Sequence, residues 1–333
     1  MTSEFELVDR LASLFSAPEG VTVGIGDDAA VLDPGRFDLV TMDTLVEGVH
    51  FRRDWSEPED IGWRALAANL SDVAAMGGGP GAFFLSLALP EPLDDQWVGR
   101  LCEGMKEAAS ELVPDSFEVS AGGGDLSSSP GPVVISITLL GEASPAGPVL
   151  RSGAVPGDRI VVLGMPGLAE AGMTVLSSDI LKNEDFPLSV QAYQRPRPQV
   201  HAGGLVGLYG VPSAMIDTSD GIIQDLGHIL EASGVGAQIE AFQLTIHPEL
   251  AALEEAGAGR ALDWMLTGGE DFCLLMTVPP ARMPKLWDMA RHRDWTVQDL
   301  GEIRAPKEGL QVMGLDGQPL DLDKSGFRHF EDS

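Results

Sequence analysis

Hydrophobic residues recur every three or four positions in three segments of the N-terminal half. The segments are residues 5–15, 59–76 and 94–112, and this period places the apolar side chains on one face of an α-helix. Three glycines and a proline at 77–80 follow the second segment, and such residues end helices. The pattern therefore predicts three amphipathic helices before residue 113.

Short apolar runs bounded by glycine, proline or aspartate predict strands. The runs cover residues 21–24, 39–42, 83–89, 133–140, 159–163, 214–216 and 272–278, and their lengths are typical of strands. Helices and strands mix without strict alternation, which favours an α+β fold over a doubly wound sheet. A stretch rich in proline and glycine at 141–157 is the best candidate boundary, so we expect domains at 1–142 and 143–333.

The acidic composition restricts the partners of the chain. Fifty-one acidic residues against 21 basic ones give a formal net charge of -30, which would repel nucleic acid and anionic membranes and attract cations. No apolar run approaches the roughly 20 residues of a membrane helix, and the N-terminus lacks the features of a signal peptide. Cys102 and Cys273 are too isolated for a disulfide framework. We therefore expect a cytoplasmic protein.

Aspartates follow several of the predicted strands, and one more lies on a predicted helix. The strand-associated ones are Asp27, Asp28, Asp43, Asp125, Asp217 and Asp220. Asp72 comes three residues after Asn69, on the same helical face. Any one of them is more simply explained as a turn or helix-cap residue. As a set, gathered carboxylates would repel one another without cations between them, and hard oxygen ligands suit Mg²⁺. Scattered histidines and separated cysteines do not support a zinc site.

Glycines adjoin these carboxylates and would let backbone amides approach phosphate closely. They stand at 24, 26, 77–79, 122–124, 268 and 269. The chain contains no Walker A sequence, so a P-loop kinase is disfavoured. The run from Gly24 to Ala29 matches a dinucleotide fingerprint only in part, and Asp27 and Asp28 would repel a pyrophosphate. Carboxylates beside glycines therefore predict phosphates bridged by magnesium.

Seven motifs, in order along the chain, resemble the thiamine-monophosphate kinase family of the aminoimidazole ribonucleotide synthetase superfamily. They are Gly24-Ile-Gly-Asp-Asp28-Ala, Thr41-Met-Asp43-Thr-Leu-Val-Glu-Gly-Val-His50-Phe, Asn69-Leu-Ser-Asp72-Val-Ala-Ala-Met-Gly, Gly123-Gly-Asp125, Arg151-Ser-Gly-Ala-Val-Pro-Gly-Asp158, Ile216-Asp-Thr-Ser-Asp220-Gly and Gly268-Gly-Glu-Asp271-Phe. The resemblance implies a two-domain α+β fold: an N-terminal β-sheet domain that pairs in a homodimer, and a C-terminal α/β sandwich domain. It also implies transfer of the γ-phosphoryl group of ATP to thiamine monophosphate, with several Mg²⁺ ions.

The resemblance carries residue roles over position by position. The metal ligands would be Asp28, Thr41, Met42, Asp43, Asp72, Asp125, Asp217 and Asp220. The nucleotide contacts would be Gly124, Asp125, Arg151 and Ser219, and the substrate contacts His50, Glu270 and Phe327. Of these, Asp43, Asp125 and Arg151 are expected to be catalytic. The chain departs from the family at Met42 and Leu126, where hydroxyl residues are usual, so Met42 would contribute only its carbonyl.

The chemistry of the reaction agrees with these roles. Transfer between two phosphates needs alignment and charge neutralisation, which bound metals and Arg151 would supply without a phosphorylated enzyme. A cationic thiazolium ring suits Glu270 and an aromatic face, although core packing explains His50 and Phe327 equally well.

Two other functions remain open. Other ATP-using members of the superfamily include selenophosphate synthetase, which carries a reactive cysteine or selenocysteine near its N-terminus, whereas the first cysteine here is Cys102. A non-catalytic protein that binds metal or senses nucleotide is the second alternative.

Overall fold

The computed structural model describes residues 21–23, 31–32, 38–90, 95–314 and 317–320, and the chain divides into two compact units. The first unit comprises Met1–Ala74 and Gly78–Ser144, and the second comprises Ala75–Gly77 and Pro145–Ser333. The predicted helix at 5–15, together with Asp28 and Phe327, lies outside the described residues. Each unit combines helices with its own sheet, which confirms the predicted α+β class.

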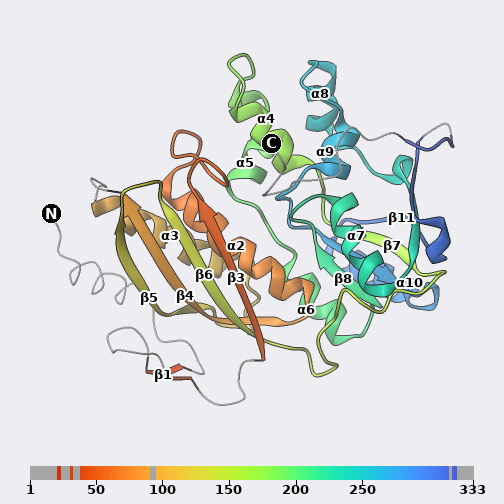
Figure 1. Cartoon of the computed structure of the whole chain (residues 1–333), viewed down its shortest axis with the longest axis horizontal. Coiled ribbons are helices and arrows are strands. Elements are labelled where there is room, and N and C mark those ends of the chain that lie inside the picture. The colour runs from red at the N-terminus through yellow and green to blue at the C-terminus, as the bar shows by residue number, and fades with distance from the viewer. Residues whose placement is uncertain (1–20, 24–30, 33–37, 91–94, 315–316, 321–333) are drawn as a thin grey trace. The chain divides into compact units, whose positions relative to one another are not determined.

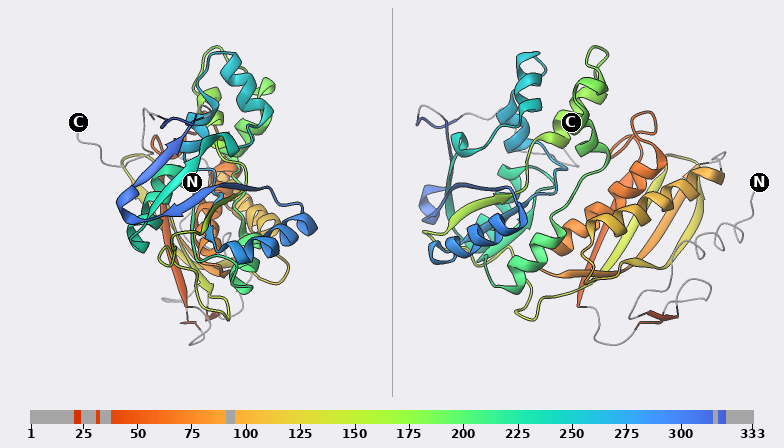
Figure 2. Two further views of the ribbon diagram at one scale, coloured as in Figure 1. Left: turned by 90° about the vertical axis from the view of Figure 1, so that its right-hand side faces the viewer. Right: turned by 180° about the vertical axis from the view of Figure 1, so that it is seen from behind.

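The first unit is built on a four-stranded sheet in the order β3-β6-β4-β5. These strands are β3 (Leu39–Val46), β4 (Gly79–Pro90), β5 (Ser120–Ser129) and β6 (Val134–Glu142). Only the β4–β5 pair is parallel. The long helices α2 (Pro58–Ala75) and α3 (Asp95–Leu112) lie across one face, as Figures 1 and 2 show. Both helices were predicted from their period. Two short strands, β1 (Val21–Val23) and β2 (Val31–Leu32), form a separate antiparallel pair.

The two faces of the first sheet differ in character. Along β3, Leu39 and Leu45 are buried, whereas Val40 is 69% exposed and Met42 64% exposed. Side chains alternate across a strand, so Thr41 and Asp43 share the face of the buried leucines. The sequence pattern predicted that β3 ends at residue 42, which is wrong, because its pairing with β6 continues to Val46. Asp43 and Asp125 therefore lie inside strands, not in turns after them.

The second unit is built on a six-stranded sheet in the order β12-β9-β11-β7-β10-β8. Its strands are β7 (Arg159–Leu163), β8 (Ala214–Asp217), β9 (Gly236–Glu240), β10 (Leu274–Val278), β11 (Val297–Arg304) and β12 (Leu310–Met313). The β12–β9 pair is parallel and the other pairs are antiparallel.

Helices cover both faces of this sheet. They are α4 (Leu168–Leu176), α5 (Pro187–Gln194), α6 (Val200–Leu208), α7 (Ile222–Ser233), α8 (Pro248–Glu255), α9 (Ala261–Thr267) and α10 (Met283–Arg293). Short 3₁₀ turns occupy Asn183–Asp185, Ala241–Gln243, Pro280–Arg282 and Pro306–Glu308. Helix α7 lies on one side of the sheet and α10 on the other (Figures 1 and 2). Every residue of β8 and β10 is accordingly buried, as expected for an α/β sandwich.

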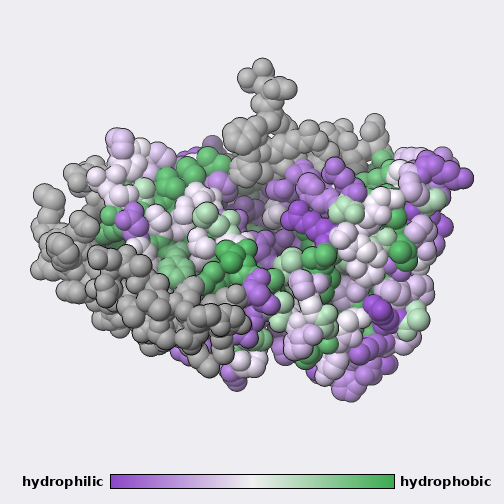
Figure 3. Space-filling model, turned by 60° about the horizontal axis from the view of Figure 1, so that its bottom comes forward, coloured by the Kyte–Doolittle hydropathy of each residue, from purple (hydrophilic) through white to green (hydrophobic). Residues whose placement is uncertain are grey.

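The surface is mixed in polarity. Hydrophilic and hydrophobic residues are interspersed over the described part of the face in Figure 3. Within the described part of the chain, no helix is both long enough and apolar enough to cross a lipid bilayer.

Candidate metal and nucleotide site

The first unit gathers three predicted ligands between β3 and α2. Thr41 and Asp43 are two residues apart on β3 and point to the same face. The hydroxyl of Thr41 donates a hydrogen bond to a carboxylate oxygen of Asp72 on α2. This bond joins a strand to a helix 31 residues later, so the fold brings hydroxyl and carboxylate oxygens together. Met42 points to the opposite face of the sheet, so only its backbone is available to this group.

Asp125 lies at the far edge of the same sheet. Across the sheet, Asp43 pairs with Ile137, Ile137 with Leu85, and Leu85 with Gly124. Three strand spacings separate the edges, or about 14 Å. Within one chain, Asp43 and Asp125 are therefore too far apart to bind the same ion. Gly124 is required where it stands, because a Cβ there would lie 2.2 Å from the carbonyl oxygen of Leu85.

His50 folds back onto the end of β3. The ring nitrogen Nδ1 of His50 accepts a hydrogen bond from the backbone N–H of Val46 at 3.0 Å. The backbone N–H of His50 donates a hydrogen bond to the carbonyl of Val46 at 2.9 Å. A ring nitrogen that accepts a hydrogen bond carries no proton, so the neutral imidazole has its proton on Nε2. His50 is half-buried, and its ring orientation is set by the turn.

In the second unit, backbone hydrogen bonds join two loops at one end of the sheet. The first follows Asp217, the last residue of β8, and holds Ser219 and Asp220; the second precedes β10 and holds Glu270. The N–H of Glu270 donates to the carbonyl of Ser219 at 2.9 Å. The N–H of Phe272 likewise donates to the carbonyl of Thr218 at 3.0 Å. The structure thus places two predicted metal ligands, a nucleotide contact and a substrate contact in one pair of loops.

The backbone of the second loop is strained. Glu270 and Phe272 have φ values of 68° and 48°, in the left-handed region that residues with a Cβ rarely adopt. A Cβ at Gly269 would lie 2.3 Å from the carbonyl oxygen of Ser219, so glycine allows the two loops to approach. Strain of this kind persists where surrounding contacts hold it.

Asp271 supplies one of those contacts. Its carboxylate accepts hydrogen bonds from the N–H groups of Gly167 at 2.5 Å and Ala169 at 2.9 Å, at the N-terminus of α4. Removal of the carboxylate from water raises the pKa of Asp271 to about 7, although both backbone hydrogen bonds lower it. Asp271 therefore anchors the Glu270 loop to α4.

Asp225 is a residue that the sequence pattern did not single out. It is 2% exposed on α7, and its carboxylate accepts a hydrogen bond from the N–H of Asp220 at 3.2 Å. Burial, followed by the negative charges of Asp217 and Asp220, raises the pKa of Asp225 to about 8. Its position in the first turns of a helix that begins after an Asp-rich loop was the available signal.

Arg151 is exposed and lies beside the edge strand β8. The carbonyl of the preceding Leu150 accepts a hydrogen bond from Met215 on β8 at 3.0 Å. The carbonyl of Arg151 accepts one from the hydroxyl of Ser233 at 3.2 Å. The backbone of Arg151 is thus held by the same unit as Asp217.

The donor atoms are of the type that magnesium binds, although the described residues of neither unit form a complete set of metal ligands. Among the described residues, no group of three or more histidine, cysteine, aspartate or glutamate side chains is arranged to hold a metal ion. The donors present are carboxylate and hydroxyl oxygens, which Mg²⁺ prefers, and Mg²⁺ commonly completes its shell with water and substrate phosphate. The residues therefore suit an ion that arrives with a phosphate ligand.

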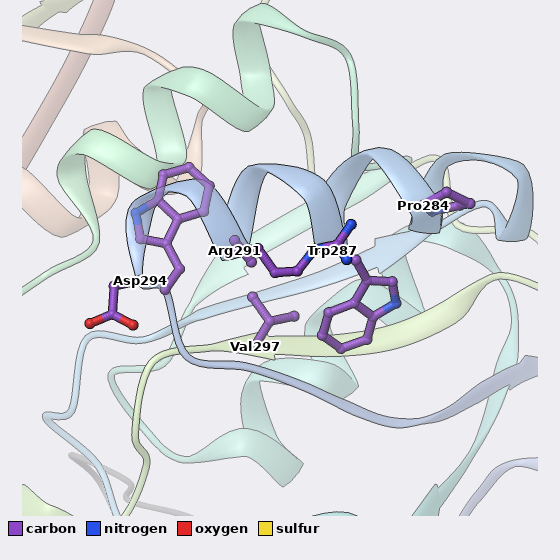
Figure 4. Close-up of a pocket in the computed structure, with 7 residues that line it drawn as sticks. Pro284, Trp287, Arg291, Asp294 and Val297 are labelled. Carbon is purple, nitrogen blue, oxygen red and sulfur yellow. The ribbon is translucent and has the colours of Figure 1, made fainter.

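Two cavities of the second unit lie outside the predicted set. One, of about 660 Å³, is lined by Trp287, Trp295 and Val297; Figure 4 shows Trp287 beside Val297. The other, of about 440 Å³, is lined by Arg195, Arg197, His247 and Trp295 and reaches Asp271. Neither is lined by Asp217, Asp220 or Glu270.

Similarity to known proteins decides between the members of the superfamily. Residues 26–143 match the family described as AIR synthase related protein, N-terminal domain. The thiamine-monophosphate kinase of Salmonella typhimurium is 38% identical, over 98% of each chain. The chain belongs to the thiamine-monophosphate kinase family. Membership confirms the resemblance drawn from the seven motifs.

Solved structures of the family share the whole fold. The thiamine-monophosphate kinase of Stenotrophomonas maltophilia K279a superposes with a TM-score of 0.80 at 32% identity, covering 96% of this chain and 98% of the other. AaThiL, in complex with AMPPCP and TMP, gives a TM-score of 0.75 at 32% identity, with coverage of 98% and 97%. The predicted two-domain fold is confirmed by these similarities.

Proposed function

We propose that this chain transfers the γ-phosphoryl group of ATP to the phosphate of thiamine monophosphate, giving thiamine diphosphate. The observation that carries the proposal is the 38% identity to a thiamine-monophosphate kinase over 98% of both chains. A relative with the same fold is known in complex with AMPPCP and TMP, which supports ATP and thiamine monophosphate as the substrates.

Magnesium ions are the proposed cofactor. Thr41, Asp43 and Asp72, together with the Met42 carbonyl and Asp28, would hold metal in the first unit; Asp217 and Asp220 would hold it in the second. Bound magnesium neutralises the charge of the phosphates. Two observations support this division of the ligands: Thr41 is hydrogen-bonded to Asp72, and the charges of Asp217 and Asp220 both act on Asp225.

A homodimer is part of the proposal. The face of β3 that carries Val40 and Met42 exposes apolar side chains, and a second copy of the same sheet packed on this face would bury them. Asp125 stands at the edge opposite Asp43 in one chain. Asp43 points to the other face of β3, which is an edge strand. We propose that Asp125 and Gly124 of one protomer reach the Asp43 group of the other around this edge, so that each site needs both chains.

The remaining roles follow from the two loops of the second unit. Ser219 and Arg151 would contact the nucleotide phosphates, and Arg151 would offset charge on the transferred phosphoryl group. His50, Glu270 and Phe327 would contact thiamine monophosphate, with the carboxylate of Glu270 opposite the cationic thiazolium. Transfer would be direct and in line, because the aspartates are engaged with metal and alignment suffices for this reaction.

Two further points accompany the proposal. The domains are taken as 1–142 and 143–333. This is supported by the division of the chain into two compact units, the first of which ends at Ser144. A cytoplasmic location is proposed because the sequence has two cysteines, Cys102 and Cys273, which are too isolated for a disulfide framework.

The decisive experiment is a direct assay. Purified protein with ATP, MgCl₂ and thiamine monophosphate should form thiamine diphosphate and ADP in equal amounts, and EDTA should stop the reaction. Product is measured by chromatography, with thiamine as an alternative acceptor for comparison. Absence of thiamine diphosphate across a range of salt and potassium concentrations would reject the proposed function.

A further inference from the structure

Two buried amide oxygens have no hydrogen-bond partner among the described residues, and both adjoin carboxylates assigned to magnesium. They are Oδ1 of Asn69 and Oε1 of Gln224. Asn69 stands three residues before Asp72 on α2, and Gln224 stands four residues after Asp220 on α7. Buried polar atoms are nearly always hydrogen-bonded, so an exception needs a physical reason. Because an unpaired amide oxygen adjoins each of two separate carboxylates, one physical reason should explain both.

The orientation of the Asn69 amide is determined by its nitrogen. Asn69 is fully buried, and its Nδ2 donates a hydrogen bond to the carbonyl of Ala65 at 3.1 Å. A carbonyl only accepts, so the nitrogen must be the atom that faces Ala65, one turn earlier in the helix. The oxygen occupies the other branch of the amide. Residues three apart on a helix are neighbours, so Asn69 lies on the same face of α2 as Asp72.

Gln224 repeats the arrangement in the second unit. Its Nε2 donates a hydrogen bond to Oδ2 of Asp220 at 2.9 Å. The amide group of Gln224 is therefore held against the Asp220 carboxylate. Its oxygen, Oε1, is bonded to the same carbon as the nitrogen that makes this hydrogen bond, so it also lies near the carboxylate. Asp220 is also fixed from its backbone, since its N–H donates to Asp225.

We infer that Asn69 Oδ1 and Gln224 Oε1 are positioning groups of the magnesium sites, each accepting a hydrogen bond from a water molecule in the coordination shell. The inference rests on the proposed function. Mg²⁺ keeps several of its waters when bound, and those waters are donors that need acceptors nearby. A further carboxylate would add repulsion to Asp72 or to the Asp217–Asp220 pair, whereas an amide oxygen accepts without adding charge.

The test compares leucine variants that remove the amide. Asn69→Leu and Gln224→Leu are matched with Gln298→Leu. Gln298 is also buried, but its amide is fully used: Oε1 accepts from the N–H of Thr245 at 2.7 Å and Nε2 donates to the carbonyl of Gly164 at 3.2 Å. Mn²⁺ affinity is measured by calorimetric titration in the presence of a non-hydrolysable ATP analogue. The melting temperature is measured separately in EDTA.

Asn69→Leu and Gln224→Leu should each weaken Mn²⁺ binding about tenfold or more without lowering the melting temperature in EDTA. Gln298→Leu should lower the melting temperature in EDTA and leave Mn²⁺ binding unchanged. Wild-type Mn²⁺ affinity in both amide variants, or a loss of melting temperature in EDTA as large as that of Gln298→Leu, would overturn the inference. Failure of the wild-type protein to bind Mn²⁺ would reject the magnesium assignment of the proposed function instead.

Discussion

The hydroxyl of Thr41 on β3 donates a hydrogen bond to the carboxylate of Asp72 on α2, across 31 residues of sequence. This bond fixes the direction of a carboxylate that Asp43 approaches from the same strand face. It makes Thr41 a specific point at which the geometry of the first unit can be tested.

Replacing Thr41 with valine keeps the shape of the side chain and removes its hydroxyl. We expect kcat to fall about tenfold to a hundredfold because Asp72 loses its orientation, whereas the free energy of unfolding should change by about 1 kcal/mol or less. The control is Thr44→Val, since Thr44 lies on the opposite face of β3 and bonds to Ser136 at 2.8 Å. Equal turnover in the two variants would remove Thr41 from the site.

Asp43→Asn and Asp125→Asn should each abolish turnover with the fold retained, as judged by circular dichroism. Each variant would lose a charge that is proposed to hold magnesium, and the expected loss in transition-state stabilisation is several kcal/mol. If each site combines Asp43 of one protomer with Asp125 of the other, mixing the two inactive variants should restore about a quarter of wild-type activity through mixed dimers. A mixture that stays inactive after subunit exchange would place both residues in one protomer's site.

An ATP analogue and Mg²⁺ should stabilise the protein more together than the sum of their separate effects. The carboxylates proposed to bind metal would repel the nucleotide until metal neutralises them, so we expect the two ligands to bind with positive coupling. Thermal unfolding with each ligand alone and with both measures the coupling, and Ca²⁺ serves as a second cation. Strictly additive shifts would mean that nucleotide and carboxylates do not share a site.

The wild-type protein should lose stability as pH rises from about 4 to about 7, in part through Asp271. Its pKa is raised to about 7 in the folded protein from a reference value of 3.8. Across that window the folded state binds more protons than the unfolded state, so deprotonation favours unfolding. Asp271→Asn cannot titrate and should flatten the decline, as measured by urea unfolding at successive pH values. A decline of equal slope in both proteins would show that Asp271 does not titrate in this window.

Phosphoryl transfer should occur in a single step. ATP with a chiral γ-phosphoryl group should give thiamine diphosphate inverted at phosphorus, because an oxygen of thiamine monophosphate attacks in line. Protein incubated with γ-labelled ATP alone should carry no label after denaturation. Retention of configuration, with a labelled protein that passes its label to thiamine monophosphate, would establish a covalent intermediate instead.

Helix prediction succeeded where the amphipathic period was long, whereas some of the short helices were missed. Helices α2 and α3 follow their apolar period over 18 residues each, a length over which the pattern is unambiguous. Helices α5 and α6, of 8 and 9 residues, were not predicted. Proline precedes or begins each of them, and α6 is apolar nearly all round, so the local sequence has no amphipathic signal where packing in the second unit produces a helix.

The amino-acid sequence by itself determined the chemical inventory of this protein: its α+β class, its acidic charge, and motifs that identify the kinase family. Those properties depend on residue type and spacing, which are read along the chain. Only the tertiary structure decided that Asp43 and Asp125 stand at opposite edges of one sheet. It likewise revealed the buried Asp225 near Asp217, and the unpaired side-chain oxygen of Asn69. Strand order and burial arise from contacts between distant segments, and no local pattern encodes them.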